Sequence, residues 1–136
     1  MTSDEVARAR RSFEADARSA MKLRAAGMTI VNGTDTGQTR FWIGFFDHLD
    51  LESMVAMGMT PAETIVAATR DAAAVAGFNT GLIARGRNAD FMVLDANPLE
   101  RISNTRTIDK VYLRGVMVDR AALRARWQMR RKLSTE

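Results

Sequence analysis

The sequence predicts an α/β fold in which helices alternate with short strands and a small β-hairpin follows. Three observations support this prediction. Apolar residues recur at helical spacing from about Asp4 to Ala26. A short run with β-branched residues, Met28–Asn32, ends in Gly-Thr-Asp, as expected where a strand gives way to a loop. A Thr-Pro-Ala-Glu segment that starts at Thr60 opens another helical stretch.

The first half of the chain predicts helix, strand, loop and helix in that order. The first helix covers about Asp4–Ala26, and Gly27 supplies its C-terminal stop. A strand over Met28–Asn32, a loop over Gly33–Asp47 and a helix from about His48 to Met57 follow. The apolar face of the first helix consists of Val6, Phe13, Ala17, Ala20 and Met21.

The segment from Thr60 carries the strongest local signal. Thr60 is a suitable N-cap, Pro61 suits the first helical position, and Glu63 can bond back to the cap. This helix should end near Gly77.

Further along, the pattern predicts a small sheet. Phe91–Leu94 is expected to be a buried strand. Ile108–Leu113 and Val116–Val118 predict a hairpin that turns at Arg114-Gly115.

The net charge of +4 and the pI near 10.3 raise the possibility of a nucleic-acid partner. We favour another interpretation, in which Asp119 caps a solvated helix whose Leu123 and Trp127 pack on the body while its arginines face water. No known nucleic-acid recognition motif is present, so such a partner is not expected. The basic residues of this helix are Arg120, Arg124, Arg126, Arg130, Arg131 and Lys132.

The composition is that of an ordinary folded domain, with 46% hydrophobic and 26% charged residues. No apolar run approaches the roughly 20 residues that cross a bilayer, and the start has no signal-peptide pattern. We therefore expect a cytoplasmic protein with no membrane partner. The absence of cysteine excludes disulfides and thiol catalysis.

Three segments together resemble the amidohydrolase superfamily, in its imidazolonepropionase-like and prolidase-like branch of metal-dependent hydrolases. Met28–Gly37 is similar to the last strand of the family's (β/α)₈ barrel, and Met57–Ala73 to the helix after it. Thr80–Asp95 is similar to the segment where the chain returns to a small β-sandwich. The resemblance is nearly continuous from about Phe13 to Trp127.

This resemblance sets an expectation for the fold. A complete barrel needs about 250 residues, and this chain has 136. We therefore expect a partial (β/α) barrel tail of helices and short strands, plus a small β-hairpin element from the side sandwich. The chain should form a single domain, 1–136. Within it, 1–77 would be the remnant of the last barrel βα units, 78–118 the sandwich-like strands and 119–136 the basic C-terminal helix.

The resemblance also implies that Asp35 helps to hold a metal ion and takes a proton from the attacking water. The family's other metal ligands have no counterpart here, and His48 is the single histidine. His48 and Glu52 are one helical turn apart with Asp47 and Asp50 nearby, a ligand set for a divalent cation, although the helix dipole also favours carboxylates there. Asp35 and His48 are the candidate catalytic and metal-binding residues, zinc is the expected metal, and two copies meeting at a twofold axis would supply four ligands.

The loop after Asp35 is rich in aromatic residues. They either line an apolar pocket for a small-molecule substrate, with Arg40 contacting an anionic group, or cover the exposed end of the sheet, which we slightly favour. The candidate substrate-binding residues are Arg40, Phe41, Trp42, Phe45 and Phe46. Two other carboxylates should be structural: Asp90 by bonding backbone near a turn, and Asp95 by opening the turn at Asn97.

Two functions follow from these expectations. The first is a hydrolase that activates water to cleave an ester, amide or phosphoester bond, assisted by a metal and oligomeric. The second is a catalytically inert, truncated amidohydrolase fragment that serves as an oligomeric or complementing subunit. A homo-oligomer is expected in either case, because part of a barrel leaves a strand edge and apolar surface uncovered.

Overall fold

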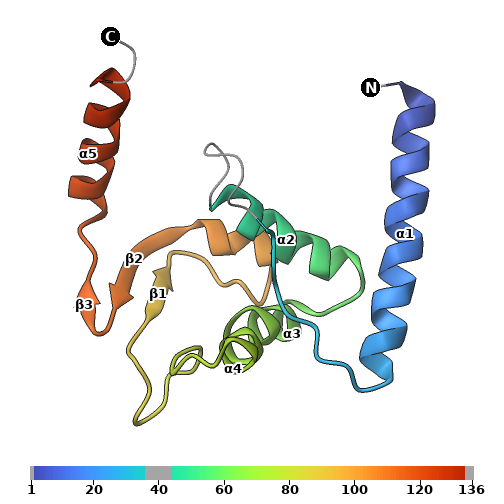
Figure 1. Ribbon diagram of the computed structural model, residues 1–136, viewed down its shortest axis with the longest axis horizontal. Coiled ribbons are helices and arrows are strands. Elements are labelled where there is room, and N and C mark those ends of the chain that lie inside the picture. Colours follow the sequence, from blue (N-terminus) through green and yellow to red (C-terminus); the bar gives the residue numbers. More distant parts are fainter. Residues whose placement is uncertain (1, 36–43, 134–136) are drawn as a thin grey trace.

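The computed structural model describes residues 2–35 and 44–133. A central body of helices and a small sheet lies between two long helices, α1 and α5, which stand at opposite ends of the molecule (Figure 1). The elements are α1 (Ser3–Ala25), α2 (Phe45–Ala56), α3 (Pro61–Val66), the π-helix η1 (Ala67–Asp71), α4 (Ala72–Ala76), β1 (Phe91–Leu94), the 3₁₀-helix η2 (Ile102–Arg106), β2 (Ile108–Leu113), β3 (Val116–Met117) and α5 (Arg120–Leu133).

Helix α1 confirms the first predicted helix. Thr2 and Glu5 form a capping box at its start, with the Glu5 N–H donating to Thr2 Oγ1 at 3.3 Å. Near its C-terminal end, Ala17 is buried and Met21 packs on the core. Val6, nearer the N-terminus, is exposed. The predicted apolar face is therefore only partly covered by the described residues.

The predicted strand Met28–Asn32 is wrong, because residues 28–35 run as an irregular segment. A strand requires a neighbouring strand to bond its backbone, and the sheet of this structure contains only β1, β2 and β3 among the described residues. Instead, Asp50 of α2 accepts the Gly33 N–H at 3.2 Å. Side chains of a helix thus hold this segment.

Helix α2 begins at Phe45 rather than at His48 as predicted. Gly44 has φ +83°, which glycine adopts without strain, and its N–H donates to Asp47 Oδ2 at 3.1 Å. This turn starts the helix early. Phe45 and Phe46, predicted to lie in a loop, consequently form its first turn.

Helix α3, η1 and α4 follow one another without a break and confirm the predicted helix from Thr60 to Gly77. The Thr60 N–H donates to Glu63 Oε2 at 2.8 Å, and Glu63 Oε1 accepts from Arg24 of α1 at 2.6 Å. The bond from the Thr60 backbone, followed by that from Arg24, lowers the pKa of Glu63 to about 2. Gly77 ends the helix at φ +71°. The buried core comprises Met54 of α2, Met59, and Ala67 of η1. Met21, Ile30 and Met57 pack against it.

The three strands form an antiparallel sheet in the order β1-β2-β3, which confirms the position of the predicted strand and the hairpin. The predicted burial of Phe91–Leu94 is wrong, because Met92 and Val93 are exposed. The rings of Phe91 and Tyr112 stack across β1 and β2 with centroids 4.6 Å apart. Arg114 and Gly115 both have positive φ, as a tight hairpin turn requires. Asp90 Oδ1 accepts the Arg114 N–H at 2.6 Å, so Asp90 has its predicted structural role.

Helix α5 begins as predicted but does not pack as predicted. Asp119 Oδ1 caps it by accepting the Ala122 N–H at 2.9 Å. Leu123 and Trp127, predicted to pack on the body, are 43% and 67% exposed. This exposure agrees with the course of the helix, which extends away from the body after β3 (Figure 1). Among the described helices, none has the length and apolar content needed to cross a bilayer.

Gly81 provides a test of how the loop after α4 packs on the π-helix. A Cβ at Gly81 would lie 2.4 Å from the Thr69 carbonyl oxygen, and φ there is +84°. Gly81→Ala should therefore destabilise the protein by at least about 2 kcal/mol, measured by urea unfolding. Gly86→Ala is the matched control, because Gly86 has φ +82° but open space around it, and it should cost about 1 kcal/mol. Equal costs for the two variants would contradict this packing.

Candidate functional site

The segment that leads to Asp35 is held against the start of α2 by two carboxylates. Asn32 Nδ2 donates to Asp50 Oδ2 at 2.7 Å, and Thr34 Oγ1 donates to Asp47 Oδ1 at 3.2 Å. Asp35 itself has φ +50°, a left-handed conformation that is uncommon outside glycine but enriched for aspartate. Such backbone conformations cluster at functional sites. The segment up to Thr34, directly before Asp35, is therefore held by Asp47 and Asp50 of α2, which the sequence pattern had suggested as metal ligands.

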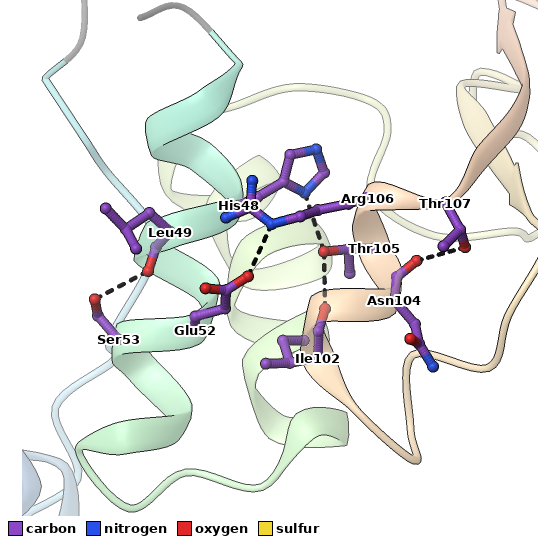
Figure 2. A network of polar contacts seen from close by, with 9 residues as sticks. All are labelled: His48, Leu49, Glu52, Ser53, Ile102, Asn104, Thr105, Arg106 and Thr107. Atoms are coloured by element: carbon purple, nitrogen blue, oxygen red, sulfur yellow. Dashed lines mark hydrogen bonds and ion pairs between the residues drawn. The ribbon is translucent and has the colours of Figure 1, made fainter.

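His48 lies on a different side of α2 and contacts η2 (Figure 2). Its Nδ1 is 3.0 Å from Thr105 Oγ1, and that hydroxyl donates to the Ile102 carbonyl at 2.8 Å. Because the Thr105 proton is used in this second bond, the hydroxyl accepts from His48 Nδ1–H. The neutral ring then carries its proton on Nδ1 and its lone pair on Nε2.

The surroundings of His48 favour its neutral form. Burial lowers the pKa of His48, and the positive charge of Arg106 lowers it further, while Asp47 and Glu52 act in the opposite direction. Arg106 is fixed in this position, because its Nε donates to Glu52 Oε1 at 2.9 Å (Figure 2). The same guanidinium lies over the Phe45 ring, 5.2 Å from the centroid.

The structure does not join the two predicted catalytic residues. Asp35 follows the segment bound by Asp47 and Asp50, whereas His48 contacts η2, and no hydrogen bond or ion pair connects Asp35 with His48 in the part of the chain that is described. Of the predicted substrate-binding residues, Phe45 and Phe46 pack edge to face with centroids 5.7 Å apart. The others, Arg40, Phe41 and Trp42, lie outside the described residues.

Sequence reasoning missed Thr105 and Arg106, which bond to His48 and Glu52 on α2. They follow α2 by about fifty residues in the chain, and neither belongs to a recognisable motif. Only a signal that pairs distant positions could have identified them.

The described residues do not by themselves fit a metal site. They contain no group of three histidine, cysteine or carboxylate side chains placed to hold an ion. Asp47, Asp50 and Glu52, the carboxylates nearest to His48 in sequence, each accept from protein donors. A catalytic zinc takes about three protein ligands. Any metal bound near Asp35 therefore needs ligands from outside this set.

An apolar hollow of about 520 Å³ lies beside the segment that precedes Asp35. The residues that line it include Val31, Asn32, Ala72, Val75 and Phe78. Phe78 is 66% exposed, so the hollow opens to solvent. It presents apolar surface that these residues leave uncovered.

The lowered pKa of His48 predicts a pH dependence of stability. A histidine whose pKa is lower in the folded than in the unfolded state stabilises the fold above pH 6.5 and loses that contribution as pH falls below it. The free energy of unfolding should therefore decrease between pH 8 and pH 5.5. Glu63 does not interfere, since its window lies between its ordinary pKa of 4.5 and about 2.

His48→Gln is the control for this effect, because it keeps a polar side chain without a titrating ring. Its unfolding free energy should change less between pH 8 and pH 5.5 than that of the unmodified protein. The same slope in both proteins would assign the pH dependence to other groups.

Several proteins of known function are similar to this chain. Ochratoxinase of Aspergillus niger is 42% identical over 81 residues, which are 57% of this chain and 16% of that protein. A structure of phenylurea hydrolase B is 42% identical over 56% of this chain and 17% of its own, with a TM-score of 0.52. A structure of a Xaa-Pro dipeptidase is 27% identical, covers 75% of this chain and 25% of its own, and has a TM-score of 0.66. The chain thus spans about a sixth of the length of the curated relatives it matches.

The likeness to these barrel enzymes confirms the predicted fold class, in which helices and a small antiparallel sheet form part of a larger architecture. A family match extends over residues 2–118, from the capping box of α1 to the end of the hairpin. The chain belongs to the amidohydrolase family.

Proposed function

We propose that this chain contributes the water-activating carboxylate, Asp35, to a hydrolase active site of the amidohydrolase type. The observation that carries the proposal is the left-handed backbone of Asp35, at the end of a segment pinned by Asp47 and Asp50. A carboxylate held in this way can accept a proton from water without reorganising the loop. The resemblance of Met28–Gly37 to the family's last barrel strand implies the same role for Asp35 and supports the proposal.

The proposed substrate contains a carbonyl–nitrogen bond, as in an amide or urea, and esters are a second class. The names of two solved relatives, a phenylurea hydrolase and a dipeptidase, support this choice. In the proposed step, the water oxygen bonds to the carbonyl carbon while Asp35 takes one water proton. The carbon–nitrogen bond then breaks, and the proton passes to the leaving nitrogen.

Assembly is part of the proposal. The family implies a divalent metal, for which we propose zinc, and the described residues do not supply its ligand set alone. We propose that a second copy of the chain provides further ligands, with Asp35 and His48 contributing from each copy. The exposed side chains of Phe78 and Ile83, the latter 92% exposed, support an association that covers apolar surface.

The alternative is a catalytically inert subunit that completes an assembly without performing chemistry. The contacts of α2 favour this alternative, because Asp47, Asp50 and Glu52 all bind protein donors and His48 bonds to Thr105. A helix whose polar groups hold neighbouring segments in place has a structural role that requires no catalysis.

Asp35→Asn separates the two functions. If the proposal holds, the zinc-supplemented protein hydrolyses a proline-containing dipeptide or a phenylurea, and Asp35→Asn lowers turnover at least about a hundredfold, as loss of a positioned general base does. His48→Ala should also impair turnover. Asp95→Asn is the matched control, since it makes the same chemical change at an exposed carboxylate, and its turnover should be unchanged.

Hydrolysis of neither substrate by the unmodified protein would favour the inert subunit. Hydrolysis that survives Asp35→Asn would place the active site elsewhere. Circular dichroism of each variant excludes unfolding as the cause.

The assembly has its own prediction. Light scattering at micromolar concentration should give a mass that is at least twice the 15.1 kDa of one chain. Phe78→Ser combined with Ile83→Ser should shift this mass toward that of one chain, because both side chains are exposed and apolar. A single 15.1 kDa species in the unmodified protein would contradict the proposed homo-oligomer.

A further inference from the structure

The basic charge of the chain is concentrated in α5. The helix Arg120–Leu133 contains six arginine and lysine residues and no aspartate or glutamate. The chain has a net charge of +4, so the rest of the molecule carries −2. The family match ends at residue 118, before this helix begins. The family match therefore rests on residues outside α5.

The same helix exposes large apolar side chains. Leu123 and Trp127 lie one helical turn apart and are 43% and 67% exposed. All residues from Arg120 to Gln128 are exposed except Ala122, which is partly buried. Arg124 and Arg126 are both exposed next to them. A partner suited to this helix attracts its positive charge and also buries its apolar side chains.

Hydrogen bonds hold the first turn of α5 to the body, and the rest of the helix points away from it (Figure 1). Arg120 Nη1 donates to the carbonyl oxygens of Ile108 at 2.6 Å and Asp109 at 3.2 Å. Asp119 caps the first turn. From there the helix extends to one end of the molecule, opposite α1 (Figure 1). In this arrangement the part of α5 whose exposure is described, residues 120–128, is exposed except at Ala122.

We propose that α5 binds an anionic lipid surface by lying in its headgroup region. Helices that do so carry arginine or lysine together with tryptophan and leucine, the tryptophan settling at the interface and the leucine in the outer acyl region. Arginines then face the acidic headgroups. A lipid surface as partner departs from the expectation of no membrane partner. That expectation rested on the lack of a bilayer-spanning apolar run and of a signal-peptide pattern, and a helix that lies in the surface needs neither. The phosphates of a nucleic acid would attract the arginines but would offer Leu123 little apolar contact.

The proposal is tested with the full chain and vesicles of phosphatidylcholine with or without 30% phosphatidylserine. Co-sedimentation should show binding to the vesicles that contain phosphatidylserine and at least about tenfold weaker binding to the neutral ones, with loss in high salt. The chain has two tryptophans, so Trp42→Phe leaves Trp127 as the sole fluorophore. Its emission should shift to the blue when these vesicles are added.

Variants assign the binding to α5. Arg124→Gln combined with Arg126→Gln should weaken binding at least about tenfold, and Trp127→Ser by a similar factor. The matched control is Arg8→Gln with Arg11→Gln, which removes the same charge from exposed positions of α1 and should change binding less than threefold.

Three outcomes would overturn the proposal. Equal binding to both kinds of vesicle would remove the role of charge. An equal loss in the α1 and α5 variants would reduce the effect to net charge alone. Helix α5 would have a different partner if the chain bound duplex RNA more tightly than the acidic vesicles. The same would follow if the chain formed a dimer that buries Trp127 and does not bind the vesicles.

Discussion

Helix α2 is the element on which the rest of the described structure depends. One side of it holds the segment before Asp35 through Asp47 and Asp50, and another holds η2 through His48 and Glu52. Met54, near its C-terminal end, is 2% exposed in the small core. Segments from both halves of the chain meet on this single helix. Its polar contacts matter because so few apolar side chains are buried around it.

The contacts of α2 also explain why, among the described residues, the carboxylates near His48 form no group of three possible metal ligands. A carboxylate that accepts from backbone and side-chain donors has less capacity to coordinate an ion, and each of these carboxylates has such donors. The bonds of Asp47 and Asp50 hold the residues directly before Asp35, and no hydrogen bond or ion pair joins Asp35 to His48 among the described residues. The part of the family architecture present here therefore contains one carboxylate, Asp35, for which we propose a catalytic role, while the chemistry we propose needs groups from a second chain.

The two ends of the molecule differ in how the body constrains them. Helix α1 is joined to α3 by the ion pair of Arg24 with Glu63, and its last turns pack on the core. Helix α5 is held at its first turn by Arg120 and Asp119. A helix anchored at one end keeps its direction but leaves its faces available. This difference separates a helix that stabilises the fold from one that can serve a partner.

The sequence by itself determined the features that depend on neighbouring residues. The capping box at Thr60, the stop at Gly77 and the turn at Arg114-Gly115 all arise from local backbone chemistry. The family resemblance was equally readable, because it rests on motifs that survive in a linear order.

Tertiary structure alone decided which of these elements meet. Met28–Asn32 has the composition of a strand, yet it is irregular, because a strand forms only when another strand bonds to its backbone. The contact of His48 with Thr105 and the exposure of Trp127 likewise depend on where distant segments lie in space. Spacing along the chain fixes a residue's local conformation, but its partners are set by the packing of the whole molecule.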